Sequence, residues 1–218
     1  MWGPLLEPGL NLLIGKRHEL RAFHQELVHH AVHHAPGVVL WLDGDHGCNP
    51  YDFAELNLTR GRQADDGADR VLLKRCMTPF QWDSAISRHL DDRLLDEDAS
   101  LVLVAPFDRP VSTDELKDWE QEDYVRYFLR HLKNIGRRHQ IPVAISVDLA
   151  RWWHTHPALA ALTVEAATAK WKIRRQADSW RAEGPSVIET PRRTLLDYLP
   201  REDVVSPLLA STPRKSAR

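Results

Sequence analysis

The sequence predicts an α/β protein: a doubly wound, mainly parallel sheet flanked by helices, with a β-hairpin at its C-terminal end. Two observations lead to this prediction. Short apolar runs alternate with segments whose apolar residues recur every three or four positions, which is the pattern of a parallel sheet covered by helices. The run at 37–42 is apolar throughout, as strands buried on both faces are, and the run at 101–105 is the clearest central strand.

The positions of strands and helices follow from these runs. The expected strands lie at 10–14, 37–42, 70–74, 101–105 and 141–147, and the expected hairpin strands at 167–175 and 186–190. The expected helices lie at 19–34, from Thr78 onward, and at 119–138. Thr78 is a favourable N-cap, and Pro79 suits the first helical turn. Gly184 and Pro185 are typical turn residues and predict the turn of the hairpin.

Length and composition suit one domain with a full core. Of the 218 residues, 43% are hydrophobic and 28% are charged, which is close to the average of globular proteins. We expect a core domain at 1–200 and a disordered basic tail at 201–218, because the end of the chain is rich in Ser, Pro and Arg. The net charge of −2 excludes a general polycation, but acidic residues gather in the middle and basic residues towards the end. That asymmetry either steers a polyanion to one face or marks an ordinary solvated surface.

Several other classes of protein are not expected. Cys48 and Cys76 lack CxxC spacing, so they predict neither a disulfide framework nor a cysteine zinc site. No apolar run approaches the roughly 18–20 residues that a membrane helix needs. The N-terminal segment lacks the basic and apolar regions of a signal peptide. We therefore expect a cytoplasmic protein without membrane contact.

One long stretch resembles a known family. EQEDYVRYFLRHLKNIGRRHQIPVAISVDLA, at 120–150, is similar to the helix-then-strand segment of the RecA/RadA recombinase family. SLVLVAPFD resembles the Walker B strand of that family, VVLWLDGDHGCNP its second strand with the catalytic glutamate, and RVLLKRCMTPFQWDSAI its third strand and following helix. Residues 167–190 resemble its terminal hairpin. The order of these segments covers residues 8–200, so the resemblance implies a RecA-like core.

The chain departs from the family at the positions that hydrolyse ATP. Hydrolysis requires a glycine-rich loop of about eight residues whose amides cradle the phosphates, followed by a Lys and a Ser or Thr that binds Mg²⁺. Here only residues 15–18 separate the first expected strand from the helix, and Arg17 stands at the hydroxyl position. The Walker B aspartate falls on Ala105, and the catalytic glutamate falls near Asp45. The polar sensor pair falls on Val147 and Asp148.

These departures predict a degenerate nucleotide site formed by Gly15, Lys16, Arg17, Asp43 and Asp45. We expect no catalytic residue and no ATP or Mg²⁺ cofactor. Lys16 and Arg17 either hold a phosphate weakly at the helix N-terminus or form a solvated helix start. Asp43 and Asp45 form a DxD pair, which binds Mg²⁺ in some proteins, but a structural role is the favoured alternative.

Two segments are candidates for binding DNA or a protein partner. Arg151, Trp152 and Trp153 follow the expected strand 141–147, where the family's loop contacts single-stranded DNA. The tryptophans stack on bases, anchor a protein partner, or belong to the core. The basic residues of the expected hairpin are the second candidate set: Lys170, Lys172, Arg174 and Arg175. The loop near 108–118 is acidic, which argues against DNA there.

The histidines of the chain raise the question of a metal. HHAVHH, at 29–34, places two imidazole pairs at the i,i+4 spacing that zinc sites use on helices. No glutamate lies between them and no third ligand is evident, so a His-rich helix face is favoured and no metal is expected. His154 and His156 form an HxH pair in an expected loop, and the same interpretation applies.

The leading functional hypothesis is a non-catalytic RecA/RadA-like paralogue that serves DNA repair or homologous recombination. Its implied partners are a RecA/RadA-type recombinase or another paralogue, with single-stranded DNA as a further ligand. One alternative is a divergent P-loop-type NTPase that uses Lys16 and Asp45. Another is an interaction or regulatory protein of the same fold outside DNA metabolism, because a fold alone does not determine function.

Overall fold

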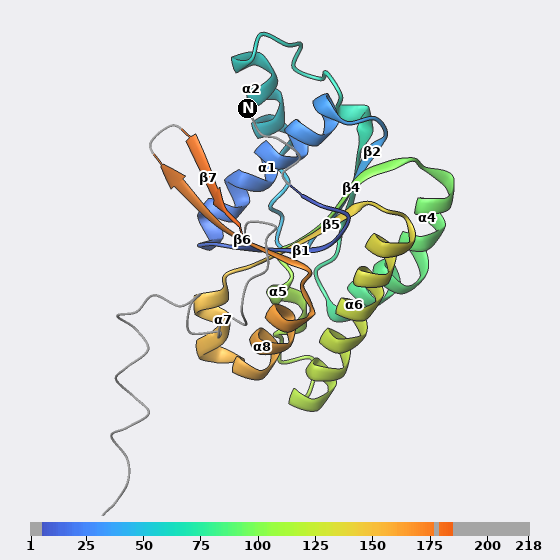
Figure 1. The fold of residues 1–218 in the computed structure, drawn as a ribbon, viewed down its shortest axis with the longest axis vertical. Coiled ribbons are helices and arrows are strands. Elements are labelled where there is room, and N and C mark those ends of the chain that lie inside the picture. The colour runs from blue at the N-terminus through green and yellow to red at the C-terminus, as the bar shows by residue number, and fades with distance from the viewer. Residues whose placement is uncertain (1–5, 177–178, 185–218) are drawn as a thin grey trace, which may run out of the picture. The chain divides into compact units, whose positions relative to one another are not determined.

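The computed structural model describes residues 6–176 and 179–184 (Figure 1). Its strands are β1 (Gly9–Ile14), β2 (Val38–Asp43), β3 (Val71–Arg75), β4 (Ala99–Ala105), β5 (Pro142–Val147), β6 (Ala169–Gln176) and β7 (Ser179–Glu183). Its α-helices are α1 (Arg17–His34), α2 (Pro50–Thr59), α3 (Pro79–Ser84), α4 (Leu90–Asp96), α5 (Asp108–Val111), α6 (Asp118–Arg138), α7 (Leu149–Thr155) and α8 (Pro157–Ala166). A 3₁₀ turn, η1 (Ala68–Arg70), precedes β3, and a π-helical turn, η2 (Ala85–His89), joins α3 to α4.

The strands form one seven-stranded sheet in the order β3-β2-β4-β5-β1-β6-β7. Neighbouring strands from β3 to β6 are parallel, and β7 is antiparallel to β6. The predicted class is therefore confirmed: a mostly parallel sheet flanked by helices, with a C-terminal antiparallel pair. Because β2, β4, β5 and β1 are neighbouring parallel strands, their carboxyl ends lie near one another along one edge of the sheet.

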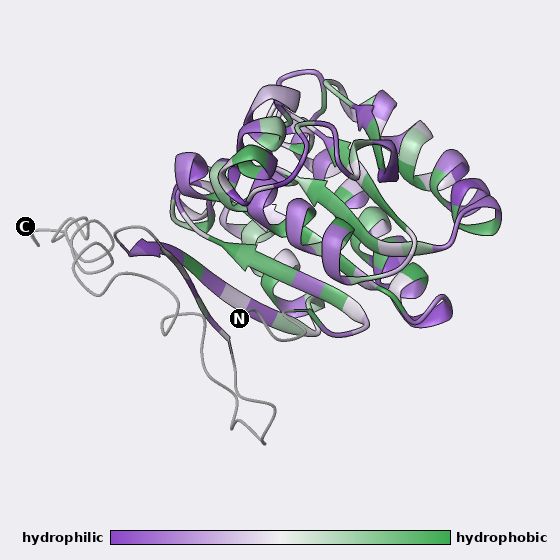
Figure 2. Ribbon diagram, turned by 90° about the horizontal axis from the view of Figure 1, so that it is seen from above, coloured by the Kyte–Doolittle hydropathy of each residue, from purple (hydrophilic) through white to green (hydrophobic). Residues whose placement is uncertain are grey.

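Apolar side chains of the strands and of the helices that cover them form a core on both faces of the sheet. On one face, Leu13 of β1 belongs to a buried cluster with Phe23 and Leu27 of α1. On the other face lies α6, and its apolar stripe is fully buried: Val125, Phe128, Leu129, Leu132 and Ile135. Figure 1 shows α1 and α6 on opposite sides of the sheet. The inner strands are largely apolar, whereas the edge pair β6–β7 mixes apolar and polar residues (Figure 2).

A close backbone contact positions α6 against the first strand. A Cβ atom added at Gly136 of α6 would lie 2.9 Å from the Cα of Gly9. Such contacts are shorter than a side chain tolerates, so two glycines allow helix and strand to approach. Among the described residues, no helix is long and apolar enough to cross a membrane.

Most predicted elements are present, but some expectations were wrong. Thr78 caps α3 as predicted, and its side chain and that of Gln81 bond reciprocally to the backbone. The helix that follows is interrupted by the π turn η2, which sequence periodicity did not indicate. Helices α2, α5, α7 and α8 were not predicted. His154, expected in a loop, lies in α7.

The second hairpin strand was also misplaced. Strand β6 pairs with Ser179–Glu183, so the chain reverses between Gln176 and Ser179 and not at Gly184 and Pro185. This pairing is stabilised because Trp180 and Ala182 pack against the core cluster beneath α1. The strand expected at 186–190 and the tail at 201–218 lie outside the described residues.

Candidate functional site

Two of the five residues predicted as a degenerate nucleotide site, Arg17 and Asp45, line a crevice at the carboxyl ends of β1, β2, β4 and β5. Ligands of open α/β sheets bind in such crevices, so this is where the fold would place a substrate. The crevice is lined by Arg17, Leu20, Arg21, His24, Asp45, Pro106, Asp108, Arg109, Asp148 and Arg151. The structure therefore brings together Arg17, Asp45 and Asp148, which are far apart in the chain.

An ion pair occupies the mouth of this crevice. The Nη2 atom of Arg17 lies 2.7 Å from Oδ2 of Asp45, and its Nε atom donates to the same oxygen at 2.9 Å. The backbone N–H of Arg17 donates to Oδ2 of Asp148 at 3.3 Å. Asp148 also accepts from the N–H of Arg151 and thereby caps α7. One residue at the start of α1 thus fastens the segments that follow β2 and β5.

Asp43 accepts hydrogen bonds from the backbone of the turn that follows β2. Its side chain is 0% exposed and accepts hydrogen bonds from the N–H groups of Asp45, Gly47 and Cys48 at 3.2, 2.9 and 3.1 Å. These bonds shape the turn after β2. Both carboxylates of the DxD pair thus have partners within the protein: backbone N–H groups for Asp43 and the guanidinium of Arg17 for Asp45.

The residues of the crevice do not fit a magnesium nucleotide. Only Gly15 and Lys16 lie between β1 and α1, too few for a phosphate-cradling loop. Ala105, where the resemblance places the Walker B aspartate, has a buried methyl group instead of a metal ligand. The cavity has a volume of about 20 Å³. One ordered water requires roughly 10–15 Å³, so the space has the size of one or two water molecules.

Two titratable residues in the crevice were missed from the sequence. His24 is 3% exposed, and burial lowers its pKa to about 3, which keeps the imidazole neutral. Burial raises the pKa of Asp108 to about 6, and the nearby Asp148 carboxylate adds to that shift against the opposing effect of its backbone hydrogen bond. His24 follows Arg17 by two helical turns, and Asp108 is the third residue after β4. These places in the sequence, on the helix that starts at Arg17 and just beyond β4, could have identified His24 and Asp108 as residues of the crevice.

Trp152 belongs to the core. It is 2% exposed, its indole N–H donates to Oγ of Ser112 at 2.6 Å, and its ring packs edge-on against Phe107. Helix α7 was not predicted, and its periodicity turns Trp152 inward while Arg151 remains exposed and Trp153 half-buried. The structure therefore contradicts a base-stacking role for Trp152, and Arg151 lies beside the crevice.

Strand alternation divides the basic hairpin residues between two faces. Lys170, Lys172 and Arg174 point to one face of β6, and Arg175 points to the other. The guanidinium of Arg175 lies over the ring of Trp180, 5.9 Å from its centroid, on the side where α1 packs. The four residues predicted as one set are thus not a single site.

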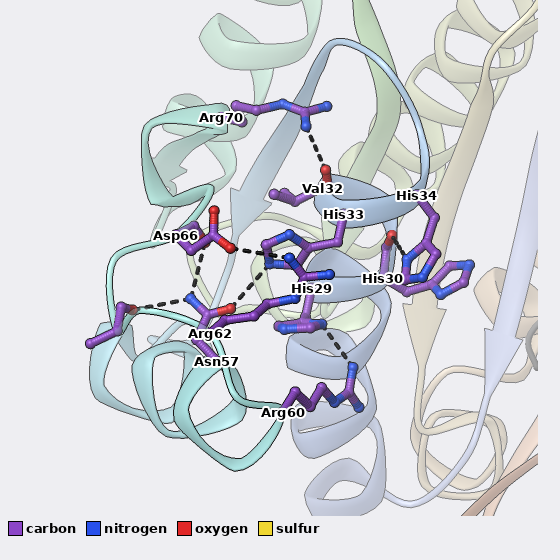
Figure 3. A network of polar contacts seen from close by, with 11 residues as sticks. His29, His30, Val32, His33, His34, Asn57, Arg60, Arg62, Asp66 and Arg70 are labelled. Carbon is purple, nitrogen blue, oxygen red and sulfur yellow. Dashed lines mark hydrogen bonds and ion pairs between the residues drawn. The ribbon is translucent and has the colours of Figure 1, made fainter.

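Two histidines of α1, His29 and His33, join this helix to α2 and the residue that follows it (Figure 3). Arg60 donates from Nη1 to Nδ1 of His29 at 2.8 Å and pairs with Glu26, while Nε2 of His33 lies 3.1 Å from Oδ1 of Asn57. In the same view, Arg70 donates to the carbonyl of Val32 at 2.5 Å near the end of α1. Within the part of the chain that the structure describes, no group of three or more His, Cys, Asp or Glu residues is arranged to hold a metal ion.

Neither a comparison with models of known protein families nor a search of curated proteins gives a match to this chain.

Proposed function

We propose that this chain is a RecA-like domain without ATPase activity that acts in the cytoplasm as an accessory factor in DNA repair or homologous recombination. One observation supports the non-catalytic part: Arg17 and Asp45, which the resemblance aligns with the Mg²⁺-binding hydroxyl and the catalytic glutamate, form an ion pair with each other. A guanidinium bound to a carboxylate supplies charge balance inside the protein. The charges of Arg17 and Asp45 are therefore balanced without a ligand.

The other departures in the crevice support the same conclusion. The two-residue connection between β1 and α1, the methyl group of Ala105 and the engaged carboxylate of Asp43 each remove one requirement of phosphoryl transfer. Each is an independent difference, and together they leave no set of residues that would orient a metal, a phosphate and a water.

The partners in this proposal are a RecA/RadA-type recombinase or another paralogue, with single-stranded DNA as a further ligand. Their support is the resemblance of 120–150 and its neighbouring segments to that family, together with the parallel sheet and its terminal antiparallel pair. In this proposal the conformation of the domain does not depend on nucleotide. We propose that the domain serves as a rigid surface for these partners.

The test is a titration with a fluorescent ATP analogue and Mg²⁺, using the unmodified protein and Lys16→Ala. We expect no saturable binding up to millimolar nucleotide with either protein. Micromolar binding that is lost in Lys16→Ala would overturn the proposal in favour of a divergent NTPase. The recombination part is tested separately by surface plasmon resonance against a purified RecA/RadA-type recombinase encoded in the same genome, where absence of binding at micromolar concentrations contradicts it.

A further inference from the structure

The edge hairpin β6–β7 has two faces of different character. On one face, Ile173 is buried, and Trp180 and Ala182 pack against the core cluster that includes Phe23 of α1. On the opposite face every described side chain of the paired segment is charged or polar. Its charged members are Lys170, Lys172 and Arg174 of β6 and Arg181 and Glu183 of β7. We call these five residues the hairpin face.

Arg181 completes this face, and sequence analysis did not identify it. It lies directly opposite Arg174 in the antiparallel register, while Glu183 lies opposite Lys172. Like charges placed directly opposite one another weaken a hairpin, so stability alone does not favour this pair. The only acid of the face, Glu183, pairs with Arg181 at 3.2 Å. Among the described residues, no ion pair or hydrogen bond engages the side chains of Lys170, Lys172 or Arg174.

The positive charge extends towards α6. The pKa of Lys170 is lowered by burial and by the positive charge of Lys133, which places the two ammonium groups within electrostatic reach of one another. Lys133 donates to the carbonyl of Ala166 at the end of α8 and is held in place there. Cations are therefore present along β6 and at its start, and the sheet pairing fixes their backbone positions.

The spacing of these cations suits a regular polyanion. Side chains on one face of a strand repeat every two residues, roughly 7 Å apart. Lys170, Lys172 and Arg174 form such a row, and Arg181 lies beside its end. This repeat is comparable with the separation of neighbouring phosphates along a nucleic-acid strand. The face has no aromatic side chain on which bases would stack.

We propose that the hairpin face binds the phosphate backbone of nucleic acid, with Lys172, Arg174 and Arg181 as the contacting residues and Arg175 outside the site. Charge complementarity selects this partner, because four cations and one acid line the face. Contacts to phosphates position a protein without reading bases, so binding is independent of sequence. This inference deepens the DNA-binding part of the proposed function and rests on it. It is independent of whether nucleotide binds in the crevice.

The experiment measures fluorescence anisotropy of a labelled oligo-dT strand and of a labelled duplex, at several salt concentrations. Arg174→Glu/Arg181→Glu is compared with Arg175→Glu, which makes the same type of charge change on the other face of the same strand. Arg93→Glu, on the remote helix α4, is a second control, and circular dichroism checks the folding of each variant. We expect the double variant to bind at least ~10-fold more weakly and its salt slope on single strands to fall by about 1.4. The DNA affinity of the two control variants should stay within about threefold of that of the unmodified protein, because their charge changes act only through long-range electrostatics.

Four results would overturn the inference. The double variant could bind like the unmodified protein, or Arg175→Glu could lose as much affinity as the double variant. Poly-L-glutamate could also bind as tightly as DNA, which would identify the partner as an acidic protein. If the unmodified protein does not bind DNA at low salt, the inference is also wrong. In that case, an ATP titration that does not saturate would still support the non-catalytic assignment. Conversely, ATP binding alongside the expected variant pattern would overturn the non-catalytic assignment and leave the hairpin face intact.

Discussion

The guanidinium of Arg17 and the carboxylate of Asp45 meet at 2.7 Å across the crevice where an α/β sheet normally receives its ligand. The side chain of Asp45 is 9% exposed and that of Arg17 is 42% exposed, so the acid is the more buried partner. Removing the arginine leaves a largely buried carboxylate unpaired, whereas removing both partners does not. This difference makes the interaction measurable.

We expect Arg17→Ala to lower the free energy of unfolding by about 1–2 kcal/mol, because Asp45 loses its charged partner. The double variant Arg17→Ala/Asp45→Ala should lose less free energy of unfolding than the two single variants lose together. The difference is the coupling energy of the attractive pair. Urea unfolding of the four proteins in the cycle measures it. Additive single effects would mean that the ion pair contributes nothing. Arg93→Ala, whose contact with Glu97 is exposed and 3.9 Å long, should change stability by less than about 0.5 kcal/mol.

Asp43 gives a second prediction because its role is purely structural. Asp43→Asn turns one acceptor oxygen into an NH₂ group that faces backbone N–H donors. We expect a loss of about 2–4 kcal/mol, since charge-assisted bonds to a fully buried group are lost. The midpoint of thermal unfolding, followed by circular dichroism, reports this change. A metal-binding role for the DxD pair would instead predict little loss of stability in metal-free buffer.

The dependence of stability on pH follows from three buried groups. Burial lowers the pKa of His24 to about 3, and burial with the charge of Arg60 lowers that of His29 to about 4, from an ordinary value of 6.5. Between about pH 4 and 6.5 the unfolded chain binds these two protons and the folded protein does not, so stability falls as the pH falls. Asp108, with a pKa raised from 3.8 to about 6, acts in the opposite sense, and its contribution is lost as the pH rises through 6.

Two histidines outweigh one aspartate, so the net free energy of unfolding should decrease from about pH 7 to about pH 5. His24→Leu should make this dependence shallower, because one of the two proton uptakes on unfolding disappears. His154→Leu, at an exposed position, should leave the slope unchanged. Urea unfolding at several pH values tests both variants. A slope that stays the same in His24→Leu would show that His24 is already protonated in the folded protein.

The paired tryptophans of α7 provide a direct comparison. Trp152→Ala should cost about 3–5 kcal/mol, because it removes a buried ring packed on Phe107 and leaves Ser112 without its partner. Trp153→Ala should cost less, because Trp153 is only half-buried. Chemical denaturation measures both changes. Equal effects of the two substitutions would contradict the assignment of Trp152 to the core.

Local patterns in the sequence were sufficient for much of the fold. The uninterrupted apolar run at 38–42 forms strand β2, which is buried from residue 39 onward, as expected for a strand covered on both faces. The stripe of α6 and the Thr78 cap depend on residues three or four positions apart, which interact within the same helix. The loss of a phosphate-binding loop was also visible in the sequence, since it depends only on how few residues join β1 to α1.

Tertiary structure decided the features that join distant segments. Arg17 lies 28 residues from Asp45 and 131 from Asp148, and only the order of the strands in the sheet brings the three together. The face on which Arg174 and Arg175 lie depends on the register of β6 with β1, which composition does not reveal. The pairing of β6 with Ser179–Glu183 depends on the packing of Trp180 beneath α1. The sequence by itself determined the strands of the parallel sheet and the long helices α1 and α6. Long-range packing determined which side chains meet, because contact energies between distant segments exist only once the sheet has formed.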